Sequence, residues 1–399
     1  MTTRSDRAKC CREMSCGSDD RRRSLSALAI DTHRRFPQGG VMAAFTSKDV
    51  ARIAGVSQST VSYVMTGKRP ISERTRQRVL DAMAQLTYEP HSGARALAER
   101  RTRVVGLVVR FGAGGDAFGL LPFIETIASS ARAHDHEVLL VTADEGSAGL
   151  RRLAGRALCD AIIMMDIEEQ DERVPVAAAL SVPVVLIGVP ADPAGLHCVD
   201  LDFEAAARMA VEELADTGHD EIVIVGYPAA AMERGLNYVG RFLRSVRRQA
   251  RVRGLPLTVI EPVDHGQEAA AADQLLTRRT GGRLGAVVPH SDDARRTGGR
   301  LGVVVPHSDA IMPLLNALRK KDVVPGRDIS LIGLSSDRWA EQSDPPYTNI
   351  SVEPRDVSRR AMETLFWLLD PSSGVERPAI DLVAPRLTRR TTVMSTPSN

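Results

Sequence analysis

The chain has 399 residues, 43% of them hydrophobic, and its 52 Lys and Arg nearly balance its 50 Asp and Glu. This length exceeds that of one compact domain. Because the net charge is close to zero, any basic surface must be confined to part of the chain. No run of about 18 apolar residues occurs, and no apolar segment follows the basic start. We therefore expect neither a membrane span nor a secretory signal, and a cytoplasmic protein.

Residues 1–45 predict a disordered basic extension. The first 41 residues carry nine basic and five acidic residues without apolar periodicity. Met42 lies four residues before Thr46, the first predicted helical cap, and its codon is an alternative start of translation. The extension is therefore either a functional basic arm or a segment that is not translated.

Residues 46–90 predict three helices, at 47–54, 58–65 and 73–86. Thr46 and Asp49 have the spacing of a capping box at the start of the first helix. Gly55 permits a left-handed turn and Ser57 can cap the second helix, which is the arrangement of a helix-turn-helix. Apolar residues at helical spacing predict one small core, made of Val50, Ile53, Val61, Val64, Val79, Met83 and Leu86.

The second of these helices has a polar face that can contact phosphates or base edges in a DNA major groove. The candidate DNA-contacting residues of this head are Thr46, Ser57, Gln58, Ser59, Thr60, Ser62 and Tyr63. Residues 42–100 hold nine Lys and Arg against five acidic residues, a local surplus that suits a DNA-binding module. The alternative is an ordinary three-helix bundle with a solvated polar face.

Residues 103–399 predict an α/β core, because short Val, Ile and Leu runs alternate with helical segments. The expected strands are 104–109, 137–141, 161–165, 184–187, 221–225, 257–260, 303–305 and 329–334. Helices are expected between them, for example at 120–133, 204–217 and 310–320. A segment of about 300 residues with this alternation predicts two doubly wound parallel-sheet lobes with a cleft between them.

The core contains a tandem duplication. Residues 278–294 and 295–311 agree at fourteen of seventeen positions. Two copies are too few for a solenoid, and each contains one predicted strand. We expect the second copy to supply the strand, because it leads directly into the helix near residue 310. The first copy is then expected to form a loop, which limited proteolysis would cut between about residues 281 and 299.

The run DVARIAGVSQSTVSYVMTGKRPISERTRQRVLDAMAQLTYEP resembles the head of the lactose-repressor (LacI/GalR) family of bacterial transcription regulators. The similarity continues with interruptions to about Val393. The resemblance implies that Gln58, Ser59 and Tyr63 read bases, with Tyr63 in place of the family's usual Arg. The operator sequence therefore cannot be transferred from relatives.

The same resemblance implies that residues 91–102 form a hinge helix that folds on DNA. Ala94 and Arg95 would contact the DNA, and Leu97 would insert into the minor groove at the operator centre. Gly93 costs about 1 kcal/mol of helix stability relative to Ala, so this hinge should be marginal without DNA.

For the core, the resemblance implies a periplasmic-binding-protein-like fold whose chain crosses between the lobes three times. Lobe one is expected at about 103–200 plus 335–371, and lobe two at about 201–334 plus 372–399. The implied effector-binding residues are Arg110, Phe111, Asn237, Ser308, Asp309 and Ser335. Asn237 replaces the family's Arg and Ser335 replaces its Asp, which removes a bidentate cation and a carboxylate that would hold sugar hydroxyls. The effector is then a sugar, another small molecule or none, and each position is equally compatible with an ordinary polar loop.

Two other classes of protein are less consistent with the residues. The glycine-rich run 112–115 could hold a dinucleotide phosphate, but it lacks the G-x-G-x-x-G spacing. A secreted solute-binding protein would share the core, but it needs an export signal and has no DNA-binding head.

The cysteines give no support for a bound metal. Cys10, Cys11 and Cys16 lack C-x2-C spacing, and Cys159 and Cys198 fall in predicted core segments, so we expect no metal, no cofactor and no disulfide framework.

We therefore expect a homodimeric transcription regulator and not an enzyme. Its partners would be double-stranded DNA with a pseudo-palindromic operator and a small-molecule effector, with no membrane partner. By the resemblance, it would repress a transport or catabolic operon.

Overall fold

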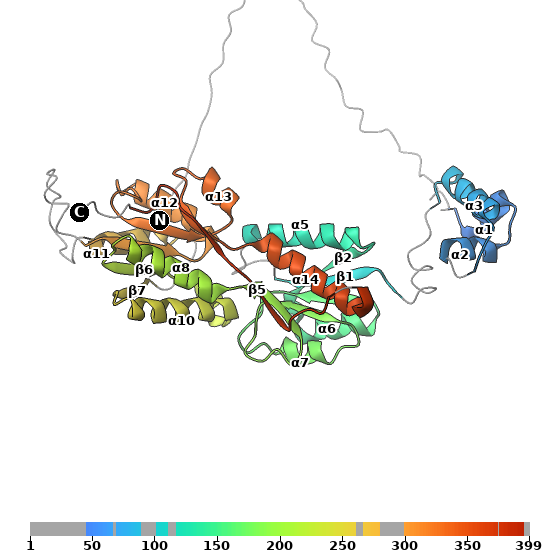
Figure 1. The fold of residues 1–399 in the computed structure, drawn as a ribbon, viewed down its shortest axis with the longest axis horizontal. Helices are drawn as coiled ribbons and strands as arrows, with labels where there is room; N and C mark the ends of the chain where they lie inside the picture. The colour runs from blue at the N-terminus through green and yellow to red at the C-terminus, as the bar shows by residue number, and fades with distance from the viewer. Residues whose placement is uncertain are drawn as a thin grey trace, which may run out of the picture. The chain divides into compact units, whose positions relative to one another are not determined.

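The computed structural model describes residues 45–66, 69–88, 101–110, 117–260, 266–279, 299–373 and 375–394 (Figure 1). The chain divides into two compact units, residues 1–89 and 90–399. Several predictions fall outside the described residues: the extension up to residue 44, the hinge residues Ala94, Arg95 and Leu97, the effector residue Phe111, and residues 280–294 of the first duplicated copy.

The first unit contains the three expected helices, α1 (Ser47–Ala54), α2 (Gln58–Thr66) and α3 (Glu73–Gln85). The Asp49 carboxylate accepts hydrogen bonds from the backbone N–H of Thr46 at 3.0 Å and from its hydroxyl at 2.8 Å. Gly55 follows α1 with a φ of 62°, a left-handed conformation that glycine adopts at little cost. The Ser57 hydroxyl accepts the Thr60 N–H at 3.1 Å and so caps α2. Local chemistry thus sets both ends of the turn.

A side chain of α3 stabilises the turn between α1 and α2. The Arg78 guanidinium donates to the carbonyl oxygens of Ala54 at 2.5 and 3.0 Å and of Gly55 at 2.9 Å. The buried core of the head consists of Val50, Ala51, Ala54, Val61, Val79, Ala82, Leu86 and Tyr88, with Val64 and Met83 packed against it. The prediction that Ile53 belongs to this core was wrong, because its side chain is 38% exposed. The short α1 buries a single stripe through positions 50, 51 and 54, and position 53 lies outside that stripe.

The second unit contains two lobes. Lobe one has a six-stranded sheet of order β11-β5-β4-β3-β1-β2, in which every adjacent pair is parallel. Its strands are β1 (Val104–Val109), β2 (Glu137–Thr142), β3 (Ala161–Met164), β4 (Val184–Ile187), β5 (His197–Leu201) and β11 (Ile380–Val383). Helices α5 (Ala117–Ala133) and α14 (Pro354–Leu369) pack on one face. Helices α6 (Gly146–Gly155) and α7 (Arg173–Ala178) pack on the other, and the short turns η1 (Ala143–Glu145) and η3 (Pro371–Ser373) join elements of this lobe.

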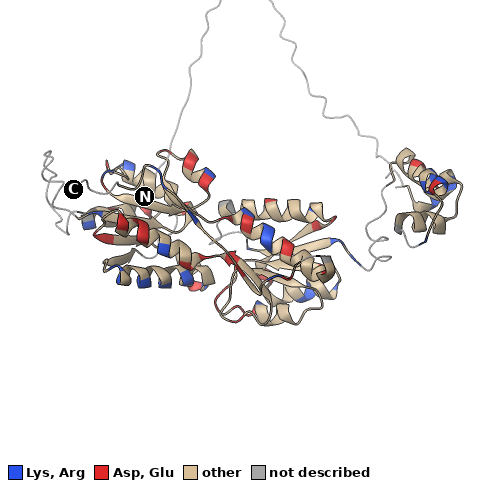
Figure 2. Cartoon of the chain, viewed as in Figure 1, with Lys and Arg blue, Asp and Glu red and all other residues tan. Residues whose placement is uncertain are grey.

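Lobe two has a six-stranded sheet of order β12-β10-β9-β8-β6-β7, in which β12 is antiparallel to β10 and the other pairs are parallel. Its strands are β6 (Glu221–Val225), β7 (Leu257–Ile260), β8 (Leu301–Val305), β9 (Ser330–Leu334), β10 (Thr348–Ser351) and β12 (Arg386–Thr388). Helices α8 (Phe203–Asp216) and α10 (Asn237–Val252) pack on one face, and α11 (Glu268–Arg279) and α12 (Ser308–Arg319) on the other. The lobe also contains α9 (Ala229–Glu233) and α13 (Asp337–Gln342). Several basic residues lie along α10 (Figure 2), of which Arg244, Arg247, Arg248 and Arg251 are exposed and Arg241 is buried.

Strand pairing corrects the expected lobe boundaries. Because β10 pairs with β9, residues 335–351 belong to lobe two and not to lobe one. Because β11 pairs with β5, residues 372–383 belong to lobe one and not to lobe two. Both strands are four residues long and mix polar with apolar side chains, so no apolar run marks them in the sequence.

The expected three crossings between the lobes are present. They lie after β5, between β10 and α14, and between β11 and β12. The second duplicated copy supplies a strand of the lobe-two sheet, as expected, because Leu301–Val305 pairs with both β6 and β9, while the corresponding residues of the first copy lie outside the described residues. Across the described ranges, no helix has the length and apolar character needed to cross a membrane.

Candidate functional site

The head presents the predicted polar residues on and next to α2. Ser57, Gln58, Ser59 and Ser62 are exposed, while Thr60 and Tyr63 are partly buried. The Gln58 side-chain amide donates to the Ser47 hydroxyl at 2.9 Å, so it links the start of α2 to the start of α1. This surface has hydroxyl and amide groups that can meet phosphates and base edges. The DNA contacts of these residues, and of Thr46, stay predictions.

Sequence reasoning missed the partner of Tyr63. The Arg69 guanidinium carbon lies 5.3 Å from the centroid of the Tyr63 ring, a cation–π contact. Arg69 lies beyond the end of α2 and is exposed. A guanidinium can stack on a ring and still donate a hydrogen bond to another group, so these two residues form one polar unit beside α2.

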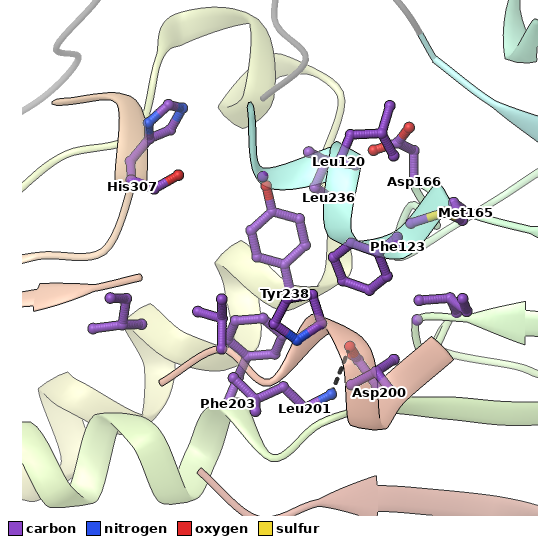
Figure 3. A pocket seen from close by; sticks show the side chains of 18 of the residues that line it. Leu120, Phe123, Met165, Asp166, Asp200, Leu201, Phe203, Leu236, Tyr238 and His307 are labelled. Atoms are coloured by element: carbon purple, nitrogen blue, oxygen red, sulfur yellow. Dashed lines mark hydrogen bonds between the residues drawn. The ribbon is translucent and has the colours of Figure 1, made fainter. Parts of the chain in front are cut away.

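The core contains a cavity of about 220 Å³ between the two lobes (Figure 3). Lobe one contributes residues that follow the carboxyl ends of its strands, among them Arg110 after β1 and Asp166 after β3. Lobe two contributes Tyr227 after β6, His307 after β8 and Ser335 after β9. Ligands of parallel α/β sheets bind at this edge of the strands, so the cavity has the position of a ligand site.

The predicted effector residues divide between the cavity wall and other places. Arg110, Ser308 and Ser335 line the cavity. Asn237 is not among its lining residues, because it starts α10, is 5% exposed, and donates its backbone N–H to the Ile167 carbonyl at 3.1 Å. Asp309 is not among them either, whereas its neighbour Ser308 is. The structure therefore brings three of the six predicted side chains together, and their effector role stays a prediction.

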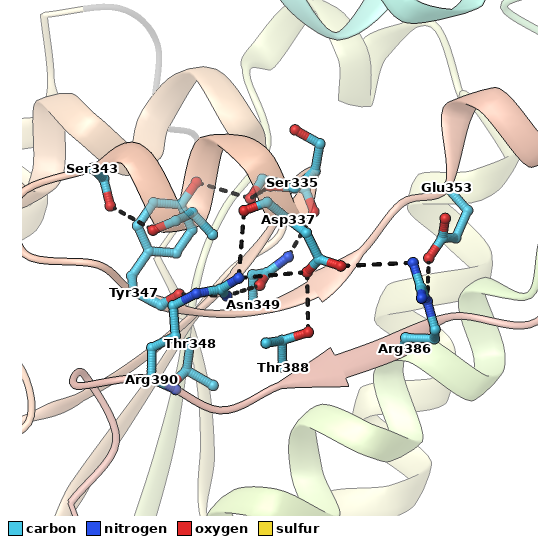
Figure 4. A network of polar contacts seen from close by, with 12 residues as sticks. Ser335, Asp337, Ser343, Tyr347, Thr348, Asn349, Glu353, Arg386, Thr388 and Arg390 are labelled. Carbon is cyan, nitrogen blue, oxygen red and sulfur yellow. Dashed lines mark hydrogen bonds and ion pairs between the residues drawn. The ribbon is translucent and has the colours of Figure 1, made fainter.

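Ser335 is fixed by a polar network behind the cavity wall (Figure 4). Its hydroxyl shares a 2.8 Å hydrogen bond with the Tyr347 hydroxyl, and its carbonyl oxygen accepts from the Asn349 side-chain amide at 3.0 Å. Arg390 donates in turn to the Asn349 side-chain oxygen. The Ser335 hydroxyl is thus already engaged within the protein.

The same network reaches one of the segments that cross between the lobes. Glu353, on the second crossing, accepts a hydrogen bond at 2.7 Å from Arg386, the first residue of β12 (Figure 4). Arg386 also lies 3.6 Å from the Asp337 carboxylate of α13. Glu353 has a φ of +43°, a left-handed conformation that is uncommon for residues other than glycine. The second crossing segment is therefore joined by ion pairs through β12 to the α13 end of the cavity wall.

Aromatic residues, which sequence reasoning missed, form much of the wall that lobe two contributes. The ring centroids of Phe203 and Tyr238 are 5.2 Å apart, those of Tyr227 and Tyr238 are 6.0 Å apart, and those of Tyr227 and His307 are 6.4 Å apart. All four residues line the cavity. Tyr227 and His307 each follow the end of a strand by two residues, so applying the strand-end rule to every predicted strand would have nominated them.

A buried ion pair also borders the cavity. Arg241 of α10, in lobe two, donates to Asp200 of β5, in lobe one, at 2.8 Å, and to Glu204 of α8 at 2.7 Å. Asp200 lines the cavity and is 7% exposed. Burial raises the pKa of Asp200 to about 7, although Arg241 favours its charged form. This pair joins the lobes through side chains next to the first crossing.

A second set of contacts joins the lobes at the loop after β3. The Glu169 N–H donates to the Gly235 carbonyl at 2.8 Å. Two ion pairs accompany this backbone contact, Arg234 with Glu168 at 3.4 Å and Arg244 with Glu169 at 3.2 Å. The lobes are therefore held together beside the cavity as well as by the crossing segments.

Family models match both units of the chain. Residues 46–91 match the model of bacterial regulatory proteins of the lacI family, and residues 211–393 match that of a periplasmic binding protein-like domain. The head of the chain is therefore similar to bacterial regulatory proteins of the lacI family. The two-lobed core of the chain and its helix-turn-helix head are the fold expected from the sequence.

The curated relatives of the chain include proteins named as transcriptional regulators. The chain is 35% identical over 190 residues to the HTH-type transcriptional regulator AglR of Rhizobium meliloti, covering 45% of this chain and 52% of the relative. It is 31% identical over 216 residues to catabolite control protein A of Priestia megaterium, covering 53% and 63%. The matched segments thus span about half to two thirds of these relatives. A longer match, to the transcriptional repressor PurR of Vibrio cholerae, covers 80% of this chain and 90% of the relative at 25% identity.

Solved structures support the fold of the chain. The lac repressor dimer bound to operator and the anti-inducer ONPF superposes with a TM-score of 0.71 at 21% identity, covering 88% of this chain and 99% of the repressor. The complex of the transcriptional regulator CelR with cellobiose superposes with a TM-score of 0.56 at 20% identity, covering 87% and 99%. At these identities the likeness shows the fold alone.

Proposed function

We propose that the chain is a sequence-specific DNA-binding transcription regulator that acts as a repressor in the cytoplasm. The observation that supports this most strongly is the capped helix-turn-helix with an exposed polar α2, within residues that match the lacI family model. Curated relatives of the chain are named as a transcriptional regulator and a transcriptional repressor. In this proposal Gln58, Ser59 and Tyr63 read base edges, while Thr46, Ser57, Thr60 and Ser62 contact the backbone or neighbouring bases.

The proposal includes a homodimer on a pseudo-palindromic operator. Two heads related by a twofold axis would place α2 of each subunit in successive major grooves. The hinge residues Ala94 and Arg95 would contact the DNA, and Leu97 would enter the minor groove between the half-sites. The lac repressor of similar fold was solved as a dimer bound to operator, which supports this arrangement.

The proposal also assigns the inter-lobe cavity to a small-molecule effector. The cavity has Arg110, Ser308 and Ser335 on its wall and lies between lobes that are linked by three crossing segments. A ligand that favours one angle between the lobes would shift the dimer towards or away from DNA binding by its differential affinity for the two states. The CelR complex with cellobiose shows a ligand bound to a chain of this fold.

Recovery of genomic DNA fragments bound by the purified protein tests the proposal. Proteins beginning at Met1 and at Met42 should enrich the same palindrome, because the head begins at Thr46. A shared palindrome upstream of transport or catabolic genes is the expected result. Salt-sensitive binding without any sequence motif would contradict a sequence-specific regulator.

A further inference from the structure

One carboxylate holds the chain where it enters the core. Asp160, which lies directly before β3, accepts the backbone N–H of Thr102 at 2.6 Å and that of Arg103 at 2.8 Å. It also accepts the Thr102 hydroxyl at 2.8 Å. The Asp160 side chain is only 10% exposed, and hydrogen bonds to a charged acceptor are stronger than those between neutral groups. Thr102 is the last residue of the predicted hinge, so these three hydrogen bonds form an exit clamp that binds the end of the hinge to lobe one.

The backbone beside the exit clamp has an uncommon conformation. Arg103 has a φ of +56°, in the left-handed region that residues other than glycine seldom adopt. Its carbonyl oxygen accepts the N–H of Glu137 in β2 at 2.9 Å, and the Asp160 N–H donates to the Val104 carbonyl at 2.8 Å. Such a conformation persists only where the surrounding contacts hold it. Asp160 is therefore one of the groups that fix the direction in which the chain enters β1.

Ring residues pack around the exit clamp. His136 Nε2 lies 3.7 Å from an Asp160 carboxylate oxygen, which is longer than a hydrogen bond. The ring centroids of His136 and Phe366, a residue of α14, are 5.1 Å apart, and His134 stacks on Phe366 at 3.9 Å. The rings cover one side of the carboxylate, whereas Thr102 and Arg103 supply the hydrogen bonds of the clamp.

The exit clamp and the cavity lie at opposite ends of the same two strands. β1 and β3 are parallel neighbours, with Val105 opposite Ala161. Beyond their carboxyl ends, Asp166 accepts the Arg110 N–H at 3.1 Å, and both residues line the cavity. An aspartate next to β3 thus binds the backbone next to β1 at each end of the pair. The clamp attaches the hinge to the strands whose other ends form part of the cavity wall.

We propose that Asp160 is a positioning residue for operator binding, which acts through the exit clamp by setting the direction in which the hinge leaves lobe one. This inference rests on the proposed hinge and operator, and it names the core residue that controls them. Without the clamp, the end of the hinge gains conformational freedom that must be lost again on the operator, so specific binding becomes weaker. Non-specific binding comes from phosphate contacts and does not need an ordered hinge.

Asp160→Asn in the full chain tests the inference. The side-chain amide keeps one acceptor oxygen and places an NH2 group against one of the two backbone N–H donors, so the exit clamp cannot form completely. We expect affinity for the palindrome recovered from genomic DNA to fall about tenfold, and affinity for a random duplex to change by less than about twofold. Fluorescence anisotropy with the two duplexes measures both affinities. Unchanged palindrome binding, or equal losses on both duplexes, would overturn the inference.

Asp328→Asn is the matched control in lobe two. The Asp328 side chain is 7% exposed and accepts the Val324 N–H at 2.9 Å, so it also holds a backbone turn through a largely buried carboxylate. This variant should leave the ratio of palindrome affinity to random-duplex affinity unchanged. The same fall in that ratio for both variants would assign the effect to lost core stability and contradict the role of Asp160.

Two variants of Thr102 decide the question even if Asp160→Asn does not fold. Thr102→Ser keeps the hydroxyl that donates to Asp160 and Thr102→Val removes it, while both keep the backbone N–H. We expect palindrome binding to be about threefold weaker for Thr102→Val than for Thr102→Ser, with equal binding to the random duplex. Equal palindrome binding by the two variants would count against the exit clamp.

A double-mutant cycle with Leu97→Ala separates positioning of the hinge from a general effect on lobe one. If Asp160 acts through the hinge, Asp160→Asn should lower palindrome affinity by less than about threefold once Leu97 is replaced. An equal loss in both backgrounds would contradict the inference. A wild-type protein that recovers no palindrome would refute the proposed regulator, whereas a palindrome bound equally well by wild type and Asp160→Asn would refute only the role of Asp160.

Discussion

Arg241 donates a hydrogen bond to Asp200 across 2.8 Å, and this contact joins α10 of lobe two to β5 of lobe one. Both residues are nearly buried, with 8% and 7% exposure. Removing one member of a buried pair leaves an uncompensated charge, which is more costly than loss of a pair at the surface. The relationship leads to two separate predictions.

Arg241→Met should destabilise the core by about 3–5 kcal/mol, because Asp200 and Glu204 lose their shared cation. Urea unfolding of the core at neutral pH measures this change. Arg244→Gln on the same helix is the control, since the exposed pair of Arg244 with Glu169 should contribute about 0–1 kcal/mol. If the two variants lowered the free energy of unfolding equally, the prediction that the buried Arg241 pair contributes more than the exposed Arg244 pair would be wrong.

The protonation of Asp200 should make core stability depend on pH. Its folded pKa of about 7 lies above the ordinary value of 3.8, so the folded state holds the proton more tightly than the unfolded state does. The contribution is fully present below about pH 4, falls as pH rises towards 7, and is then constant, with a total on the order of 4 kcal/mol at most. Asp200→Asn removes this dependence. The free energy of unfolding of wild type minus that of the variant should therefore decrease between pH 4 and pH 7, and an increase over that range would contradict the prediction.

Gly55→Ala should destabilise the head by about 1 kcal/mol, because an alanine at a φ of 62° is strained. Its Cβ would also lie 3.4 Å from an Arg78 nitrogen. Gly155→Ala is a suitable control, since its φ is not positive and its Cβ would meet no atom within 4 Å. We expect this control to leave the core unchanged or to stabilise it slightly. Thermal unfolding followed by circular dichroism, with each variant compared in the transition of its own unit, provides the measurement.

Tyr63 and Arg69 should act on DNA as a coupled pair, because the Arg69 guanidinium lies over the Tyr63 ring. In a double-mutant cycle with Tyr63→Leu and Arg69→Ala, the loss of operator affinity should be non-additive by about 0.5–1 kcal/mol. Arg76→Ala on α3 serves as a control and should combine additively with Tyr63→Leu. Additive losses for the first pair would show that the two side chains contact DNA independently.

Leu97→Ala should weaken binding to the specific operator while leaving salt-dependent binding to random DNA nearly unchanged. The reason is that a minor-groove wedge acts only where the bent operator is formed, whereas non-specific affinity comes from phosphate contacts. Fluorescence anisotropy with operator and random duplexes at two salt concentrations separates these terms. Equal losses of affinity for both duplexes would contradict the insertion of Leu97 into the minor groove.

The sequence predicted those parts of the fold whose signal is local. The α1 and α2 boundaries follow from Thr46, Gly55 and Ser57, whose side-chain or backbone chemistry acts within a few residues. The strands β1, β4, β6 and β7 coincide with the predicted ranges, which consist mostly of apolar residues. The strands β5, β10, β11 and β12 were not predicted, because each is short and mixes polar with apolar side chains. The lobe boundaries were misplaced for the same reason.

Fewer features of the cavity than of the fold could be predicted from the sequence. Arg110, Ser308 and Ser335 were nominated, and all three line it. The aromatic wall was not, because Phe203 and Tyr238 come from different helices of lobe two and meet only after that lobe has folded. The engagement of Ser335 by Tyr347 is likewise a tertiary contact between residues that no local pattern relates.

The ion pair between Glu353 and Arg386 ties the second crossing segment to the first residue of β12 in lobe two. The Arg386 side chain is 68% exposed, so this pair contributes about 0–1 kcal/mol. A contact of that strength can break and form again without unfolding either lobe. The second crossing segment is therefore attached to lobe two by a weak side-chain contact, whereas the chain itself supplies its connection to α14 of lobe one.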